Sequence, residues 1–147
     1  MRLLRLFLYF TLTLFMLSCS LTFPYKTSKS LRETYAHVVS GDGIKFYYNI
    51  GKNGNLDISI KNVSGLMYKT LDLDVSDNTG KLNVYKSYVN VKNLGVRNLN
   101  ITLNDNTKFV RIKYTYLPVK EDSFLNPNYG FEDLPDISGN ATLLIKY

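Results

Sequence analysis

Apolar and polar residues alternate one by one through most of this chain, and that period limits its fold more than any other feature. The alternation is clearest over residues 56–61, 71–76, 99–104 and 110–116. Successive side chains of an extended strand point to opposite faces, so each run predicts a strand with one buried and one solvated face. No stretch beyond the N-terminal leader shows a sustained helical period. The chain is therefore predicted to be all-β.

Turns rich in Gly, Asn and Asp separate these runs. Residues 51–54, Gly-Lys-Asn-Gly, join an expected strand over 44–50 to the next strand and predict a hairpin. Between residues 82 and 91 the alternation changes parity, which indicates a bulge or an edge strand. The last strand is expected over 141–147. Short turns of this kind are typical of antiparallel sheets.

These segments make about seven strands, with one long connection over residues 118–140. Because each strand has a single apolar face, two sheets must pack together to bury both faces. The pattern resembles immunoglobulin-like sandwich domains of exported bacterial proteins, without the paired cysteines and tryptophan of antibody domains. We expect residues 36–147 to form an antiparallel β-sandwich.

The first 18 residues have the composition of a signal peptide and predict an N-terminal signal helix. Arg2 and Arg5 form a basic start, and an apolar run over residues 6–17 follows. That run is shorter than the roughly 20 residues needed to span a membrane. Export of the chain is therefore expected.

Cys19 is the only cysteine and stands directly after this leader. It resembles the acylated cysteine of bacterial lipoproteins, although Met16 and Leu17 depart from the residues usual in that motif. The resemblance implies a lipid anchor in a bacterial membrane, on the periplasmic or surface face of the cell envelope. Residues 19–35 would then be a tether. Cleavage after Ser20 is the alternative, and it would give a soluble secreted protein.

A short helix is expected at the end of this tether. Ser30 and Glu33 have the spacing of a capping box, in which each side chain bonds the backbone at the other's position. The residues that follow allow only one or two turns.

The composition argues against catalysis, a cofactor and nucleic-acid binding. His37 is the single histidine, and it has no second histidine or cysteine with which to build a triad or a metal site. Asp72 and Asp74 share one strand face, where solvated carboxylates are ordinary. The net charge of +6 is modest for an exported chain. We expect a non-enzymatic protein without metal or cofactor.

The long connection is the best candidate for a binding site. Between residues 121 and 136 it has five acidic residues and no basic one, together with an unusual number of apolar side chains. Such a loop on a rigid scaffold either covers an open end of the sandwich or recognises a partner. The candidate binding residues are Phe124, Tyr129, Phe131, Glu132 and Asp133.

The expected function is a membrane-anchored protein-interaction module of the cell envelope, with an envelope or surface protein as its partner. Binding would use the long connection or the addition of a strand at a sheet edge. The alternative is a carbohydrate- or cell-wall-binding module that uses outward Tyr and Asn side chains. Tyr85 and Tyr88 are candidates for it, whereas Tyr114 and Tyr116 share parity with the expected core.

Overall fold

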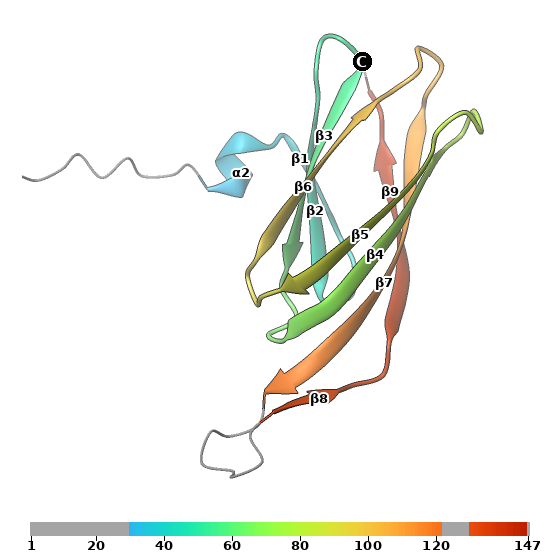
Figure 1. The fold of residues 1–147 in the computed structure, drawn as a ribbon. Helices are drawn as coiled ribbons and strands as arrows, with labels where there is room; N and C mark the ends of the chain where they lie inside the picture. Colours follow the sequence, from blue (N-terminus) through green and yellow to red (C-terminus); the bar gives the residue numbers. More distant parts are fainter. Residues whose placement is uncertain (1–29, 122–129, 147) are drawn as a thin grey trace, which may run out of the picture.

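A computed structural model describes residues 30–121, except for the side chain of Glu121, and residues 130–146. In this part the chain forms one short helix, α2 (Leu31–Thr34), and nine strands (Figure 1). The strands are β1 (His37–Ser40), β2 (Ile44–Ile50), β3 (Asn55–Asn62), β4 (Met67–Asp77), β5 (Asn83–Val91), β6 (Val96–Thr102), β7 (Phe109–Glu121), β8 (Phe131–Asp133) and β9 (Ile137–Leu144). Within these ranges, no helix is long and apolar enough to cross a membrane.

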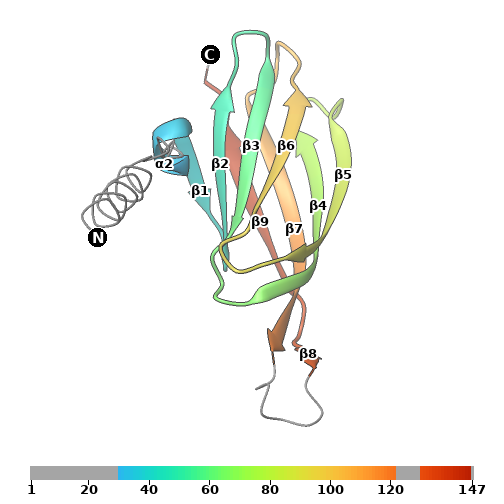
Figure 2. The same cartoon turned by 60° about the vertical axis from the view of Figure 1, so that its left-hand side comes forward.

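The strands form two antiparallel sheets packed face to face, as the alternation predicts. The first sheet has the order β1-β2-β3-β6. The second has the order β5-β4-β7, and both β8 and β9 pair with the far side of β7 (Figure 2). The chain crosses between the sheets after β3, after β5 and after β6. The predicted β-sandwich is confirmed.

The seven longest strands are those that the sequence predicts. The hairpin of β4 and β5 is followed by a return to β6 beside β3, and β7 then runs between β4 and β9. The sequence prediction lacked β1 and β8, which have only four and three residues. Runs of that length are too short for a period of two to stand out.

The core consists of the inward rows of both sheets. Phe46 and Ile58 from the first sheet and Leu71, Ile112 and Leu143 from the second have 1% or less of their surface exposed. Ile58, Leu71 and Ile112 occupy apolar positions of the alternating runs. Burial of one such side chain stabilises the fold by about 1.5–3 kcal/mol, so the alternating pattern itself specifies the packing.

The structure decides or corrects three details of the strand prediction. The register shift lies between Tyr68 and Thr70 of β4, against β7, whereas β5 pairs with β4 without a shift. The parity change over residues 82–91 belongs to an edge strand, one of the two predicted alternatives, and Asn90 in this strand has a φ of 51°. The long connection is shorter than expected, because β7 continues to Glu121 and β9 begins at Ile137. The length of β7 gives the additional residues of β9 a partner.

The predicted short helix is present and is fixed to the first sheet. The backbone N–H of Ser30 donates to the Glu33 carboxylate at 2.9 Å, which completes the capping box. The amide of Asn49 in β2 donates to the carbonyl of Thr34 at 2.8 Å. The rings of Tyr35 and Tyr47 lie 6.5 Å apart between their centroids. The chain therefore enters the sandwich over the outer face of the first sheet.

Buried tyrosines hold the turn between β1 and β2. The hydroxyls of Tyr68 and Tyr116 donate to the carbonyls of Gly43 and Asp42, and the N–H of Asp42 donates to the Tyr114 hydroxyl at 3.0 Å. Burial raises the pKa of Tyr68 and that of Tyr116 above the ordinary value, so both hydroxyls keep their protons as donors. These tyrosines have a structural role.

Candidate interaction site

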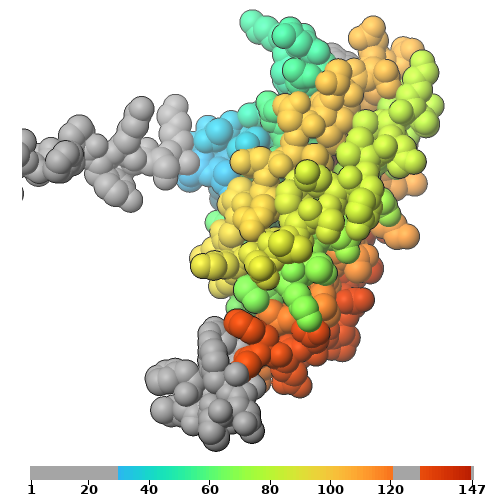
Figure 3. All heavy atoms as spheres, viewed as in Figure 1, coloured from blue at the N-terminus to red at the C-terminus, as the bar shows by residue number. Residues whose placement is uncertain are grey.

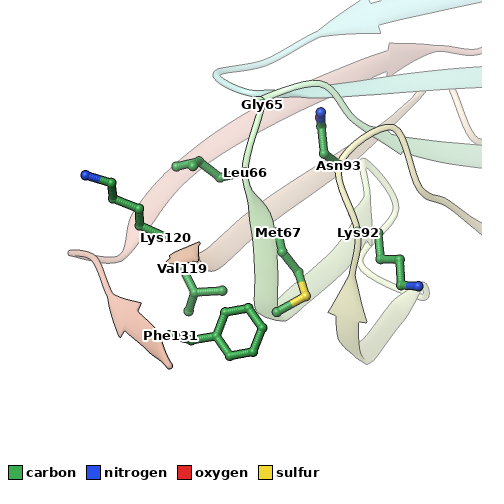
Figure 4. Close-up of a pocket in the computed structure, with 8 residues that line it drawn as sticks. All are labelled: Gly65, Leu66, Met67, Lys92, Asn93, Val119, Lys120 and Phe131. Atoms are coloured by element: carbon green, nitrogen blue, oxygen red, sulfur yellow. The ribbon is translucent and has the colours of Figure 1, made fainter. Parts of the chain in front are cut away.

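One end of the sandwich carries a hollow of about 640 Å³. It lies where β4 begins, β7 ends and the β5–β6 turn passes, and β8 forms its outer wall (Figure 4). β8 exists because β7 extends past the rest of the sheet and pairs through Val119 and Lys120 with Asp133 and Glu132. The hollow is thus a product of the long strand β7.

The floor of the hollow is apolar. Met67 and Val119 are neighbours in the β4–β7 register, and Phe131 of β8 points toward them in Figure 4. Phe131 is 55% exposed, whereas Val119 is 3% exposed. An exposed aromatic ring above a buried aliphatic floor is the composition expected of a binding surface.

The rim of the hollow is basic. Lys92 and Lys120 line it from opposite sides and are both exposed (Figure 4). Lys69 and Asp133 line an adjoining, smaller hollow of about 340 Å³, which shares Phe131 with the first one. The Nζ of Lys69 lies 2.8 Å from Oδ2 of Asp133. Asp133 is the one carboxylate among the described lining residues, and this ion pair neutralises it. The rim therefore favours a partner with acidic groups around an apolar centre.

A buried amide shapes the inner wall. Asn62, at the end of β3, is 1% exposed. Its Nδ2 is directed at the carbonyls of Leu66, Val91 and Lys92 at 2.6–3.2 Å, and its Oδ1 accepts from the N–H and hydroxyl of Ser64. One side chain thus holds the two turns that flank the hollow.

The sequence did not identify Asn62 as important. Asn is frequent in this chain, and residues 62–65, Asn-Val-Ser-Gly, look like any polar turn. The sequence does give one signal that Asn62 is buried. Asn62 continues the row of alternate residues 56, 58 and 60, whose side chains are apolar. A polar residue at a buried position must find partners, and turn backbones supply them.

The predicted binding residues fall partly within the described chain. Phe131 lines this hollow, and Asp133 lines the adjoining one together with Phe131. Glu132 is exposed on β8 opposite Lys120. Phe124, Tyr129 and the predicted lipidation site Cys19 lie outside the described residues. The structure therefore brings two of the predicted side chains together with Met67, which the sequence did not single out.

The residues considered for catalysis have other contacts. The His37 ring stacks on Tyr48 with centroids 4.9 Å apart, at the sheet edge. Asp72 accepts a hydrogen bond from the hydroxyl of Tyr85 at 2.9 Å, and Asp74 is exposed on the same strand face. Across residues 30–121 and 130–146, no three His, Cys, Asp or Glu side chains are grouped as a metal site requires.

A second, polar hollow of about 420 Å³ lies between α2 and the first sheet. Its lining includes Tyr35, Asn49, Asp57 and Asn100. These polar groups already bond within the protein, since Asn49 holds the end of α2 and Asn100 donates to Asp57. A ligand here would have to compete with those bonds.

No protein-family model, no curated protein and no solved structure matches the chain. The function is therefore argued from the sequence and the geometry of the site.

Proposed function

We propose that this chain is a lipid-anchored protein of the bacterial cell envelope that binds another envelope or surface protein without catalysing a reaction. Cys19 would take the acyl groups after removal of residues 1–18. Two or more acyl chains hold a protein stably in a membrane, because each buried methylene contributes about 0.8 kcal/mol. The domain would remain close to one membrane face.

The observation that carries the interaction role is the hollow beneath Phe131. It combines an exposed aromatic ring, the aliphatic floor of Met67 and Val119, and exposed lysines at 92 and 120. Interfaces concentrate their binding energy in such apolar centres, while charged rims select and orient the partner. The expected partner inserts an apolar side chain and presents carboxylates to the two lysines.

The carbohydrate-binding alternative has less support. It needs several outward tyrosines on one surface, but Tyr47, Tyr48, Tyr68, Tyr114 and Tyr116 are buried. Tyr85 is 64% exposed, and its hydroxyl is bonded to Asp72. A single such ring makes a poor sugar platform.

Mass spectrometry of the membrane-purified protein tests the anchor. A mature N-terminus at Cys19 that carries acyl mass is expected. An unmodified N-terminus at Leu21 would overturn the anchor and leave a secreted protein.

Site-specific photo-crosslinking in intact cells tests the interaction surface. A photoreactive side chain in place of Phe131 is expected to capture one protein, and capture should fall at least tenfold when Lys92 and Lys120 are both changed to Glu. The same probe in place of Tyr85, an exposed aromatic on β5, is the control and should capture nothing specific. Equal capture from both positions, or capture unaffected by the charge reversal, would refute this site.

A further inference from the structure

The second sheet has two long edge strands that differ in how they are protected. β5 and β9 lie on opposite sides of the central pair β4 and β7 (Figure 1). An edge strand presents unpaired backbone N–H and C=O groups, which invite pairing with another chain. Proteins block that pairing with charges or covering groups where it would be harmful.

The β5 edge is blocked. Lys86 lies between Val84 and Tyr88 in the row of β5 residues that faces the other sheet. Its Nζ lies 5.9 Å from the centre of the Tyr88 ring. Inward-pointing charges on an edge strand oppose the addition of another strand. Side chains from β6 also cover this edge.

Hydrogen bonds between β5 and β6 join the two sheets at this edge. The guanidinium of Arg97 donates to the carbonyls of Val89 and Asn90 at 3.4 and 3.3 Å. The hydroxyl of Tyr88 donates to the carbonyl of Asn98 at 3.0 Å. In Figure 3, the yellow and orange atoms of β5 and β6 form one continuous surface.

The β9 edge is less protected, although β1 of the first sheet lies beside it. Residues 137–144 contain no charged side chain and no proline. The N–H of Ile145 donates to the carbonyl of Lys108 at 2.9 Å. Because every second residue of an antiparallel strand bonds to its neighbour, this bond shows which residues of β9 bond to β7 and which do not. The backbone groups of Ser138, Asn140 and Thr142 therefore point away from β7.

The contacts around β9 agree with this direction of its backbone groups. The carbonyl of Leu144, two residues beyond Thr142, accepts from the Tyr48 hydroxyl of the other sheet and so also points away from β7. Within the described ranges, the backbone of Ser138, Asn140 and Thr142 makes no hydrogen bond on this side. These three residues form an open, uncharged edge.

We propose that β9 pairs with β9 of a second copy of this chain, in antiparallel register about Asn140. Asn140 would face Asn140 of the second copy, and Ser138 would face Thr142, so that polar uncharged side chains meet across the junction. A self-complementary contact of this kind is made twice around a twofold axis. Because the β5 edge is blocked, the assembly stops at a dimer.

The orientation of such a dimer suits an anchored protein, and this step rests on the proposed lipid anchor. The axis that relates two antiparallel strands of one sheet is perpendicular to that sheet. It therefore places the first sheets of both copies on the same side. Since α2 packs on the outer face of the first sheet through Tyr35 and Asn49, both chains enter from one side. Two anchors would reach a single membrane.

Disulfide cross-linking of the full chain in its own membrane tests the pairing. Paired backbones in an antiparallel ladder lie about 5.5 Å apart between Cα atoms, within the range that a disulfide spans. Asn140→Cys is expected to give a cross-linked dimer on oxidation, and Ser87→Cys on β5 is the matched control that should stay monomeric. The unsubstituted chain reports separately whether Cys19 has a free thiol.

A second variant keeps the test independent of cross-linking. Thr142→Pro removes an N–H that points to the open edge and that β7 does not use, a change that edge strands tolerate. It is expected to fold and to halve the mass of the detergent-solubilised particle, while Ser87→Pro leaves the mass unchanged. No excess of dimer in Asn140→Cys over Ser87→Cys, or cross-linking to a different protein, would overturn self-pairing. Dimerisation of the unsubstituted chain by oxidation would instead count against acylation of Cys19.

Discussion

The two ends of the sandwich are each organised by one buried polar side chain, but the two side chains differ in charge. At the end with the hollow, Asn62 holds the β3–β4 and β5–β6 turns through neutral hydrogen bonds. At the opposite end, the Asp77 carboxylate accepts bonds from Thr79, Leu82 and Thr107 and so joins the β4–β5 turn to the β6–β7 turn (Figure 2). One end depends on an amide and the other on an ionised acid.

The candidate binding site lies at the end that the amide organises. Around Asp77 the turns are drawn together, and the neighbouring Asn78 accepts bonds from the N–H groups of Lys108 and Phe109. Around Asn62 the amide likewise joins two turns, and the hollow opens beside them. The amide does not titrate, so the bonds of Asn62 persist over the range of pH in which a carboxylate would titrate.

The largest effect is expected for Asn62→Ala. The change leaves buried carbonyls and the Ser64 N–H without their partners, and each such loss has a large desolvation penalty. We expect the free energy of unfolding to fall by about 3 kcal/mol in urea titrations. Asn93→Ala, an exposed amide in the β5–β6 turn, is the control and should change it by less than about 0.5 kcal/mol. Equal effects of the two substitutions would refute the role of Asn62.

Asp77→Asn is expected to have the next largest effect. The carboxylate accepts four hydrogen bonds, and an amide offers only one acceptor oxygen to the same donors. The expected loss of stability at neutral pH is about 2 kcal/mol, measured by the same titration. Asp74→Asn, exposed on the same strand, should be nearly neutral. A neutral result for Asp77 would mean that the turns at this end do not depend on the charge.

The pH dependence of stability separates the two ends. Burial alone would raise the pKa of Asp77, but hydrogen bonds from Thr79, Leu82 and Thr107 outweigh it and lower the pKa to about 2. A carboxyl with a lowered pKa in the folded state stabilises the fold above its unfolded value, about 3.9. This contribution is lost as the pH falls from about 4 to about 2.

Unfolding titrations between pH 5 and pH 2 measure that loss. The unsubstituted chain and Asn62→Ala should both lose stability steeply over this range, whereas Asp77→Asn should show a shallower slope. A slope in Asp77→Asn as steep as in the unsubstituted chain would assign the acid sensitivity to other carboxyls.

The same contrast shows what the sequence could and could not predict. The alternation of Leu56, Ile58 and Ile60 specified a strand and its buried face, because that period is a direct consequence of backbone geometry. It could not show that Asn62 and Asp77 are buried, since their partners come from turns up to 30 residues away. Long-range polar contacts leave no local period.

The candidate site was predicted only in part for the same reason. Phe131 and Asp133 stood out within an acidic, apolar connection. Met67 and Lys69 did not, because the predicted strand began only at residue 71, whereas β4 begins at Met67. The register shift in β4 beside Lys69 and the pairing of β8 with the end of β7 bring these segments together. Neither event has a signature in the local pattern.

The smallest effect is expected for Lys69→Ala. The Lys69–Asp133 pair joins β4 to β8 at the rim of the hollow, but the two side chains are 54% and 50% exposed. Solvent screens an ion pair of this kind, so we expect a change of less than about 0.5 kcal/mol in the free energy of unfolding. The local effect should be larger, because β8 is held by three residue pairs and this ion pair. Amide hydrogen exchange should therefore accelerate in β8 and remain unchanged around Asp77, whereas acceleration at both ends would mean that the pair supports the whole fold.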